Sequence, residues 1–134
     1  MKSYFYHLQI NIDFQNLAFY KGLMEFIGWE VIFEGKEAVG YKSGINGDLW
    51  FTKVDHAQTS DYDQKGVNHI SIRVQNITDV KETKSYLEKN SVKMLFDTPR
   101  HRPEFTSKGD ETYYQIMFET PDKILFEIVY IGAK

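Results

Sequence analysis

The chain has 134 residues and no cysteine, which allows one ordinary domain or two small fused units and excludes a disulfide framework and a thiolate nucleophile. Its formal net charge is -3, and the 16 Lys and Arg residues and 19 Asp and Glu residues are scattered, so no basic stripe favours binding to nucleic acid. Because no apolar segment has membrane-spanning length and MKSYFYHLQI lacks a signal-peptide pattern, we expect no membrane contact and a cytoplasmic location.

The first predicted element is a β-strand from Tyr4 to Asp13, YFYHLQINID. Successive side chains of a strand point to opposite faces. One face therefore carries a polar set that includes a histidine, and the other is apolar; the polar face holds Phe5, His7, Gln9 and Asn11, and the apolar face holds Tyr4, Tyr6, Leu8, Ile10 and Ile12. The polar face is either in contact with solvent or the lining of a site that contains His7.

A helix is predicted over residues 16–28, NLAFYKGLMEFIG, with either Asp13 or Asn16 as N-cap and Gly28 at its C-terminal end. Its apolar residues recur at helical spacing, namely Leu17, Tyr20, Leu23, Met24 and Ile27. Three extended segments follow, WEVIFEG, EAVGYKSG and GDLWFTKV, separated by the turn sequences GKE and GING. The first half thus reads strand, helix and three strands.

The polar segment 55–66 is predicted to be a surface linker, after which the same order begins again. GVNHISIRV is a strand, and DVKETKSYLEKN is a helix with Asp79 as N-cap, Asn90 at its end and Val80, Thr83 and Leu87 facing inward. VKMLFDT is a strand, PRHRPEFTSKGDE is irregular, and TYYQIMFET and KILFEIVYI form a hairpin around Pro121–Asp122.

The two halves also repeat in sequence, since YHLQI and NHISI each place a histidine on the opening strand. We therefore predict a single domain over 1–134, with module one at 1–54, the linker at 55–66 and module two at 67–134. Neither half buries its sheet face alone, so the modules are expected to pair within one chain or across two chains.

Side-chain alternation indicates that His7, His69 and Glu127 lie on sheet faces that look into one cavity. Two imidazoles and a carboxylate form a facial ligand set that holds a divalent ion and leaves positions open for water or substrate. The alternative is that each histidine is an ordinary hydrogen-bonded residue of the core or rim, and that Glu127 faces solvent on an edge strand.

These residues give the chain a resemblance to the vicinal oxygen chelate superfamily, the glyoxalase/bleomycin resistance/dioxygenase fold. The resemblance covers nearly the whole chain, through YHLQINID and the helix and strand after it, GDLWFTKVD, VNHISIRVQNITDVKETKSYLEKNSV and YYQIMFETPDKILFEIVY. It implies an α+β fold in which two tandem βαβββ modules form a partly open mixed-sheet barrel with the helices outside. It also implies a divalent metal ion held by His7, His69 and Glu127.

The sequence departs from the family pattern at the fourth ligand, because Trp50 stands at the position in the first module that corresponds to Glu127. A three-ligand site resembles those of the fosfomycin-modifying and extradiol-cleaving branches more than that of glyoxalase I. The closing turn also carries Lys123 where the family usually has Gly.

The segment from Thr98 to Tyr114 is too long and polar for a simple connection and resembles an Arg-Pro loop of an uncharacterised glyoxalase-like branch. Arg100, His101 and Arg102 are expected to hold an anionic substrate over the metal, and the remaining substrate-binding candidates are Gln9, Trp50 and Tyr114. In the alternative interpretation the loop is solvated and its arginines pair with Glu104 or Asp110. His56, in the linker, is expected to be a surface residue.

The leading hypothesis is a glyoxalase-like metalloprotein that acts on a small oxygen-chelating substrate as a lyase, isomerase or dioxygenase, with Glu127 or a bound water handling protons. The ligand types admit Zn, Ni, Mn, Fe or Co. The alternative is a non-catalytic small-molecule binder of the bleomycin-resistance type, in which Phe5, Trp50, Phe105 and Tyr114 matter most; a third is a partner-binding subunit without chemistry. A homodimer is expected because family members often complete one another's cavities.

Overall fold

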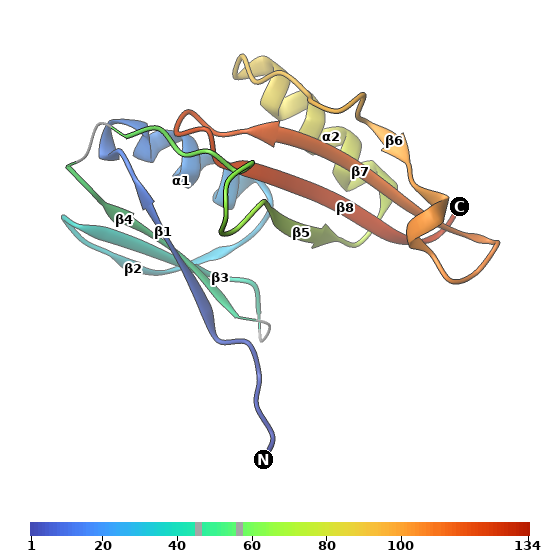
Figure 1. Ribbon diagram of the computed structural model, residues 1–134, viewed down its shortest axis with the longest axis horizontal. Coiled ribbons are helices and arrows are strands. Elements are labelled where there is room, and N and C mark those ends of the chain that lie inside the picture. The colour runs from blue at the N-terminus through green and yellow to red at the C-terminus, as the bar shows by residue number, and fades with distance from the viewer. Residues whose placement is uncertain (45–46, 56–57) are drawn as a thin grey trace. The chain divides into compact units, whose positions relative to one another are not determined.

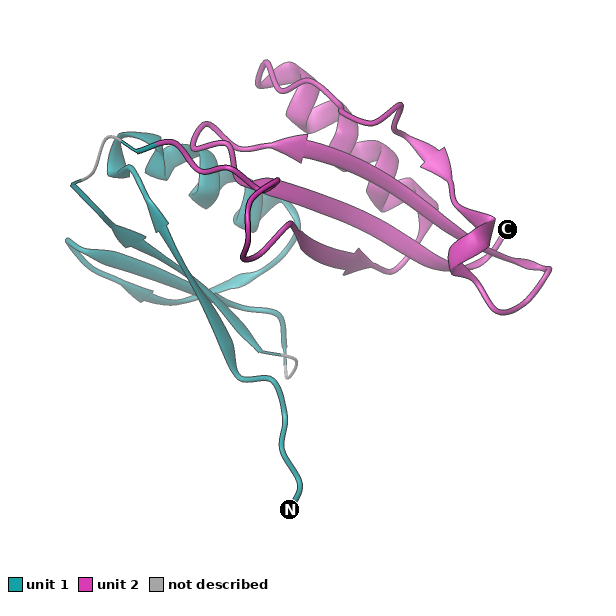
Figure 2. Cartoon of the chain, in the orientation of Figure 1, with its two compact units in different colours: residues 1–58 teal, residues 59–134 magenta. Residues whose placement is uncertain are grey.

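The computed structural model describes residues 1–44, 47–55 and 58–134. The chain divides into two compact units, which Figure 2 colours separately: unit 1 is Met1–Gln58 and unit 2 is Thr59–Lys134. The division falls inside the segment 55–66 that the sequence predicts to be a linker. The middle of the predicted GING turn and His56 lie outside the described residues.

Unit 1 contains one mixed sheet and one α-helix (Figure 1). Its elements are β1 (His7–Ile12), η1 (Phe14–Asn16), α1 (Leu17–Phe26), β2 (Glu30–Glu34), β3 (Ala38–Lys42) and β4 (Asp48–Lys53). The strand order is β1-β4-β3-β2, in which β1 and β4 are parallel and the other neighbours are antiparallel.

Local chemistry explains where the helix of unit 1 begins and ends. The side chain of Asp13 accepts a hydrogen bond from the backbone N–H of Gln15, which caps η1 ahead of α1. Helix α1 buries Tyr20, Leu23 and Met24, as the helical spacing predicts. Gly28 follows the helix with φ of +83°, a conformation that glycine adopts at little cost.

Strand β1 begins at His7, later than the predicted start at Tyr4. Its partner β4 begins at Asp48, which is paired with His7 and whose N–H donates a hydrogen bond to the Tyr6 carbonyl, so the ladder ends at this point. Tyr4, Phe5 and Tyr6 are 87%, 70% and 73% exposed. Within β1 the predicted alternation is confirmed, because every second side chain from His7 is exposed.

Unit 2 repeats the architecture of unit 1. Its elements are β5 (Ile70–Val74), α2 (Ile77–Lys89), β6 (Arg100–His101), η2 (Pro103–Phe105), β7 (Glu111–Glu119) and β8 (Leu125–Ala133). The strand order is β5-β8-β7-β6, with β5 and β8 parallel and the remaining pairs antiparallel. The predicted α+β fold, built from two βαβββ modules with open mixed sheets, is confirmed.

The cap of α2 corrects the sequence prediction. Asn76, not Asp79, is the N-cap: its side chain accepts a hydrogen bond from the backbone of Asp79, whose carboxylate accepts one from the backbone of Asn76. Two pairs in the sequence fit the capping-box spacing of three residues, Asn76 with Asp79 and Asp79 with Glu82. The spacing alone therefore does not show which pair caps the helix. Val80, Thr83 and Leu87 are buried, as predicted.

The predicted strand VKMLFDT is wrong. Ser91, Phe96 and Asp97 have φ of 63°, 54° and 55°, which extended strands do not allow, and a single bridge joins Met94 to Phe118. The segment predicted to be irregular instead contains the fourth strand, β6, followed by η2.

The β7–β8 hairpin around Pro121–Asp122 is confirmed. Lys123 has φ of 56°, so the position where the family usually has Gly keeps a glycine-like backbone conformation. No helix among the described residues has the length and hydrophobicity to cross a membrane.

Candidate functional site

One face of the unit 2 sheet borders a hollow of about 600 Å³. Its lining combines aromatic and aliphatic side chains with two guanidinium groups, a histidine and carboxylates: Tyr62, Asp63, Asn68, His69, Phe96, Arg100, Arg102, Phe105, Tyr113, Gln115, Met117, Leu125 and Glu127. Helix α2 packs on the sheet but contributes no residue to this lining, so it covers the opposite face. The hollow has the size and the mixture of apolar walls and few polar groups that small-molecule sites share.

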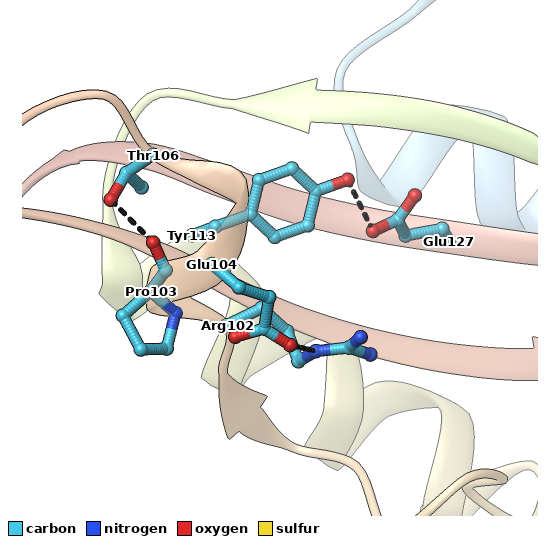
Figure 3. A network of polar contacts seen from close by, with 6 residues as sticks. All are labelled: Arg102, Pro103, Glu104, Thr106, Tyr113 and Glu127. Carbon is cyan, nitrogen blue, oxygen red and sulfur yellow. Dashed lines mark hydrogen bonds and ion pairs between the residues drawn. The ribbon is translucent and has the colours of Figure 1, made fainter.

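Glu127 lies in the centre of the sheet. On β8 it is paired with Ser71 of β5 on one side and with Met117 of β7 on the other, and it is 2% exposed. The phenol of Tyr113, on the same face of β7, donates a hydrogen bond of 2.7 Å to Glu127 Oε1, which Figure 3 shows. A buried carboxylate requires such compensation, because desolvation strongly disfavours an unpaired charge.

The phenol of Tyr113 stays protonated at neutral pH. Burial, and then its hydrogen bond to Glu127, raise the pKa of Tyr113 to about 12. Tyr113 therefore remains a hydrogen-bond donor to Oε1 and leaves Oε2 of Glu127 free to face the hollow.

Asn68 sets the tautomer of His69. The Asn68 Nδ2 donates to the backbone carbonyl of Tyr62 at 3.0 Å, which orients the amide so that Oδ1 lies 2.8 Å from His69 Nδ1. Since Oδ1 is only an acceptor, Nδ1 carries a hydrogen, and Nε2 is the ring nitrogen that is not bound by Asn68. This is the arrangement in which an outer hydrogen bond orients a metal-binding imidazole.

Nε2 of His69 faces the carboxylate of Glu127, with 3.4 Å between Nε2 and Oε2, and the two form an ion pair when the ring is protonated. This separation is longer than the 2.7–2.9 Å of a charge-assisted N–H···O contact. It matches the roughly 3.3–3.4 Å between two ligands bound tetrahedrally at 2.0–2.1 Å to one ion. His69 and Glu127 therefore fit two ligand positions of a divalent cation, although no three His, Asp or Glu side chains cluster as a metal site among the described residues.

Unit 1 places three of the predicted site residues on one face of its own sheet. His7 is paired with Asp48 and Gln9 with Trp50 in the parallel β1–β4 ladder, so His7, Gln9 and Trp50 share a face. In unit 2, Ser71 stands two residues after His69 and is paired with Glu127. Trp50 therefore occupies in unit 1 the register position that Glu127 occupies in unit 2, as the sequence alignment of the repeats predicts.

Trp50 is held by its neighbours in the sheet. Gly40 of β3 is its partner, and a Cβ at Gly40 would lie 2.8 Å from two carbons of the indole ring. The ring also contacts Phe33, with 5.6 Å between ring centroids. A bare backbone at Gly40 therefore creates the space in which the indole lies.

The two predicted substrate-binding arginines line the hollow of unit 2. Arg100 is paired with Gln115 and is exposed, and its guanidinium makes no hydrogen bond or salt bridge to the part of the chain that the structure describes. Arg102 forms a hydrogen-bonded ion pair with Glu104, and its guanidinium carbon lies 4.5 Å from the centroid of Phe105. Arg102 therefore follows the solvated-loop interpretation in part. Arg100 reaches Glu104 only through its charge, which adds to the effect of the Arg102 hydrogen bond in lowering the pKa of that carboxyl.

Tyr114 does not line the hollow. It is 8% exposed and lies on the opposite face of β7, where its ring contacts His101 at 4.7 Å between centroids. Alternation places the preceding residue, Tyr113, on the site face, and counting back from Glu127 through the β7–β8 register identifies it. Asn68 was also missed, although its position beside a candidate ligand histidine is the signal for an orienting hydrogen bond.

No family model matches the sequence, and no curated protein matches it. Solved structures do match. A proposed glyoxalase from Bacillus halodurans is 23% identical, with a TM-score of 0.77 and coverage of 94% of each chain. A glyoxalase/bleomycin resistance protein from Albidiferax ferrireducens is 16% identical, with a TM-score of 0.73 over 93% of this chain and 97% of that one.

A fosfomycin resistance protein from Listeria monocytogenes is 20% identical, with a TM-score of 0.65 over 97% of this chain and 94% of that one. This chain has the glyoxalase/bleomycin resistance/dioxygenase fold. The resemblance to the vicinal oxygen chelate superfamily is thus confirmed for the fold. Within that glyoxalase-like fold, Glu127 lies on the closing strand of the second module. The predicted opening strand GVNHISIRV begins only at Ile70, so His69 immediately precedes β5.

Proposed function

We propose that this protein is a glyoxalase-like metalloprotein that binds a divalent cation through His7, His69 and Glu127 and acts on a small substrate with neighbouring oxygen atoms. The observation that supports this most is the pairing of His69 and Glu127. Asn68 commits Nδ1 as a donor, so Nε2, 3.4 Å from Glu127 Oε2, is the ring nitrogen available to a cation. A cation bound to both residues would be held by one imidazole nitrogen and one carboxylate oxygen.

His7 is the proposed third ligand, because it opens the first module as His69 opens the second. The modules supply the complete set either within one chain or across a homodimer. Two imidazoles and one carboxylate suit Zn, Ni, Mn, Fe or Co and leave positions for the substrate. Such an ion supplies Lewis-acid stabilisation of an enolate-like or oxyanion charge.

Glu127 is the proposed catalytic group for proton transfer, in a lyase, isomerase or dioxygenase type of reaction. Tyr113 holds Oε1, so one carboxylate oxygen stays fixed while Oε2 faces the hollow. Burial of Glu127 keeps bulk water from that carboxylate. The substrate is proposed to contact Arg100 and Arg102 from unit 2 and Gln9 and Trp50 from unit 1.

Metal titration of protein freed of metal with EDTA tests the proposal. Calorimetry with Zn²⁺ is expected to give one site per chain in the natural protein and an affinity lowered by at least about 100-fold in His69→Ala. The matched control is Lys81→Gln on α2, which is expected to behave as the natural protein. Equal Zn²⁺ affinity in His69→Ala and the control would defeat the proposal.

A second candidate, a non-catalytic small-molecule binder, is supported by the aromatic walls of the hollow. Phe96 and Phe105 line it and are 50% and 55% exposed. In that case His69 serves only as a hydrogen-bonding residue. Ligand binding that is unchanged by EDTA, together with the absence of Zn²⁺ binding, would favour this candidate over the first.

A further inference from the structure

We propose that the hollow of unit 2 selects a monoanionic carboxylic acid with an apolar, ring-sized body, whose carboxylate binds Arg100. This inference rests on the proposed function, because it assigns the substrate class of the same site. It depends on the charge balance of the lining, on the register of the sheet and on the exposed rings around the hollow.

The charge balance favours a single negative charge on the ligand. Arg102 already has a counterion, since its ion pair with Glu104 lowers the pKa of that carboxyl and keeps it ionised. Arg100 is the other guanidinium of the lining; its charge also lowers the pKa of Glu104, but it forms no hydrogen bond or ion pair with the described residues. Asp63 and Glu127 line the hollow as well, so in the metal-free protein a ligand with two negative charges would meet repulsion.

A guanidinium binds a carboxylate through two parallel N–H···O bonds, which gives both strength and orientation. The planar fork of Arg100 is therefore matched to the carboxylate of an organic acid. Arg102 is held against Phe105 by its stacking contact, and this makes it part of the wall.

The sheet register sets the length of the ligand. Arg100 is paired with Gln115, Gln115 precedes Met117 by two residues on β7, and Met117 is paired with Glu127. The backbone positions of Arg100 and Glu127 are thus two strands apart across the sheet and two residues apart along the strands. With ~4.8 Å between strands and a rise of ~3.4 Å per residue, the distance between the two positions is about 12 Å. Both side chains stand on the face that borders the hollow, and a ligand of one ring and a short chain fits a span of this length.

The walls between those two ends are apolar. Phe105 contacts Tyr113 at 5.3 Å between centroids, and Met117 and Leu125 complete the floor. Phe96 and Phe105 keep about half of their surface exposed at the hollow. An apolar ring that covers them is stabilised by removal of that surface from water.

The test uses the full chain, treated with EDTA, with methyl-labelled methionine. Phenylacetate is the probe, phenylacetamide is its neutral match and phenethylamine is its cationic match. The methyl resonance of Met117, assigned with Met117→Leu, reports ring contact in the hollow. We expect phenylacetate to shift this resonance saturably and to bind at least about tenfold more tightly than the amide.

Arg100→Gln is expected to lower phenylacetate affinity by about tenfold or more and to leave the weak amide binding unchanged. Arg100→Lys keeps the charge and is expected to fall between the two. Lys81→Gln removes the same charge from α2 and is expected to bind as the natural protein does. Equal binding of acid and amide by the natural protein, or no shift at Met117, would overturn the inference.

Zn²⁺ titration of the same samples separates this inference from the proposed function. Zn²⁺ binding without phenylacetate binding would overturn the substrate class alone. Phenylacetate binding through Arg100 without Zn²⁺ binding would overturn the metal site and support the carboxylate site. Retention of Zn²⁺ affinity in Arg100→Gln is expected, because that side chain is not a proposed ligand.

Discussion

The two modules share one topology and differ at one register position. In unit 1 the residue opposite Gln9 is Trp50, and its indole lies over Gly40 and beside Phe33. In unit 2 the equivalent position holds Glu127, which Tyr113 binds from the neighbouring strand. The same sheet position thus holds an aromatic side chain in one module and a buried acid in the other.

The neighbours of each residue have changed with it. Glu127 lies opposite Met117, whereas Trp50 lies opposite Gly40, where the missing side chain leaves room for a large ring. Glu at position 50 would leave the space above Gly40 empty, whereas Trp at position 127 would meet the side chain of Met117. A single exchange is therefore expected to destabilise each sheet for a different reason.

The largest expected effect comes from removing the acid. Glu127→Gln keeps the shape of the side chain and removes its charge, so Zn²⁺ affinity is expected to fall by more than about 100-fold in calorimetry. Glu82→Gln, at an exposed position on α2, is the matched control. Unchanged Zn²⁺ affinity in Glu127→Gln would contradict the proposal that the acid of the second module is a metal ligand.

The next effect concerns Asn68, which has no metal contact in the proposal. Asn68→Ala is expected to lower Zn²⁺ affinity by about 10- to 100-fold, because the His69 ring loses the acceptor that orients it. In metal-free protein, the imidazole nitrogen shifts of His69 should report a protonated Nδ1 in the natural chain and a mixture of tautomers in the variant.

Asn68→Asp keeps an acceptor oxygen beside Nδ1 and serves as the conservative variant. Its tautomer is expected to match that of the natural protein. A neutral His69 ring with its hydrogen on Nε2 in the natural, metal-free protein would contradict this role of Asn68.

A substitution at Gly40 tests the packing of Trp50 in the first module. Gly40→Ala places a methyl group against the Trp50 ring, so we expect the free energy of unfolding to fall by about 1–3 kcal/mol and the tryptophan emission to shift. Gly109→Ala, where an added Cβ meets no atom within 4 Å, is the control and is expected to change stability by less than about 0.5 kcal/mol. Equal stability of the two variants would show that Trp50 does not depend on the space above Gly40.

The smallest effect concerns Tyr62 at the rim of the hollow. Its phenol donates to Glu119 Oε1 at 2.6 Å, and this hydrogen bond, with burial second, raises the pKa of Tyr62 to about 12. Since the folded pKa lies above the ordinary value of 10.0, the contribution of this contact to stability is present below about pH 10 and is lost as the pH rises toward 12.

Ultraviolet titration checks the prediction for Tyr62. The difference between the natural protein and Tyr62→Phe should show one phenol that ionises late, and Glu119→Gln should bring that ionisation to lower pH. Ionisation of Tyr62 near pH 10 in the natural protein would contradict the prediction.

Alternation and repetition were sufficient to predict much of the fold. The shared His positions of YHLQI and NHISI, and the spacing around Val80 and Leu87, identify two similar modules without any knowledge of pairing. The prediction fails at VKMLFDT because its composition favours a strand, while Phe96 and Asp97 adopt left-handed backbone conformations that depend on the tertiary structure.

The sequence predicts which face of a strand a candidate site residue lies on, because side chains alternate. It does not predict which residues of neighbouring strands are paired. The burial of Glu127 and the exposed side of His7 follow from alternation. The choice of Tyr113 over Tyr114 requires the pairing of β7 with β8, and the role of Asn68 requires the direction of an amide, neither of which the sequence states.

The central proposal is that His7, His69 and Glu127 bind one divalent ion, and a crystal structure grown with Zn²⁺ and phased by its anomalous signal tests it most directly. The account predicts a single strong anomalous peak within about 2.0–2.2 Å of a His7 nitrogen, His69 Nε2 and a Glu127 oxygen, from one chain or from two chains of a dimer. A fully occupied zinc site elsewhere, with His69 Nε2 and Glu127 bound to no metal, would contradict it.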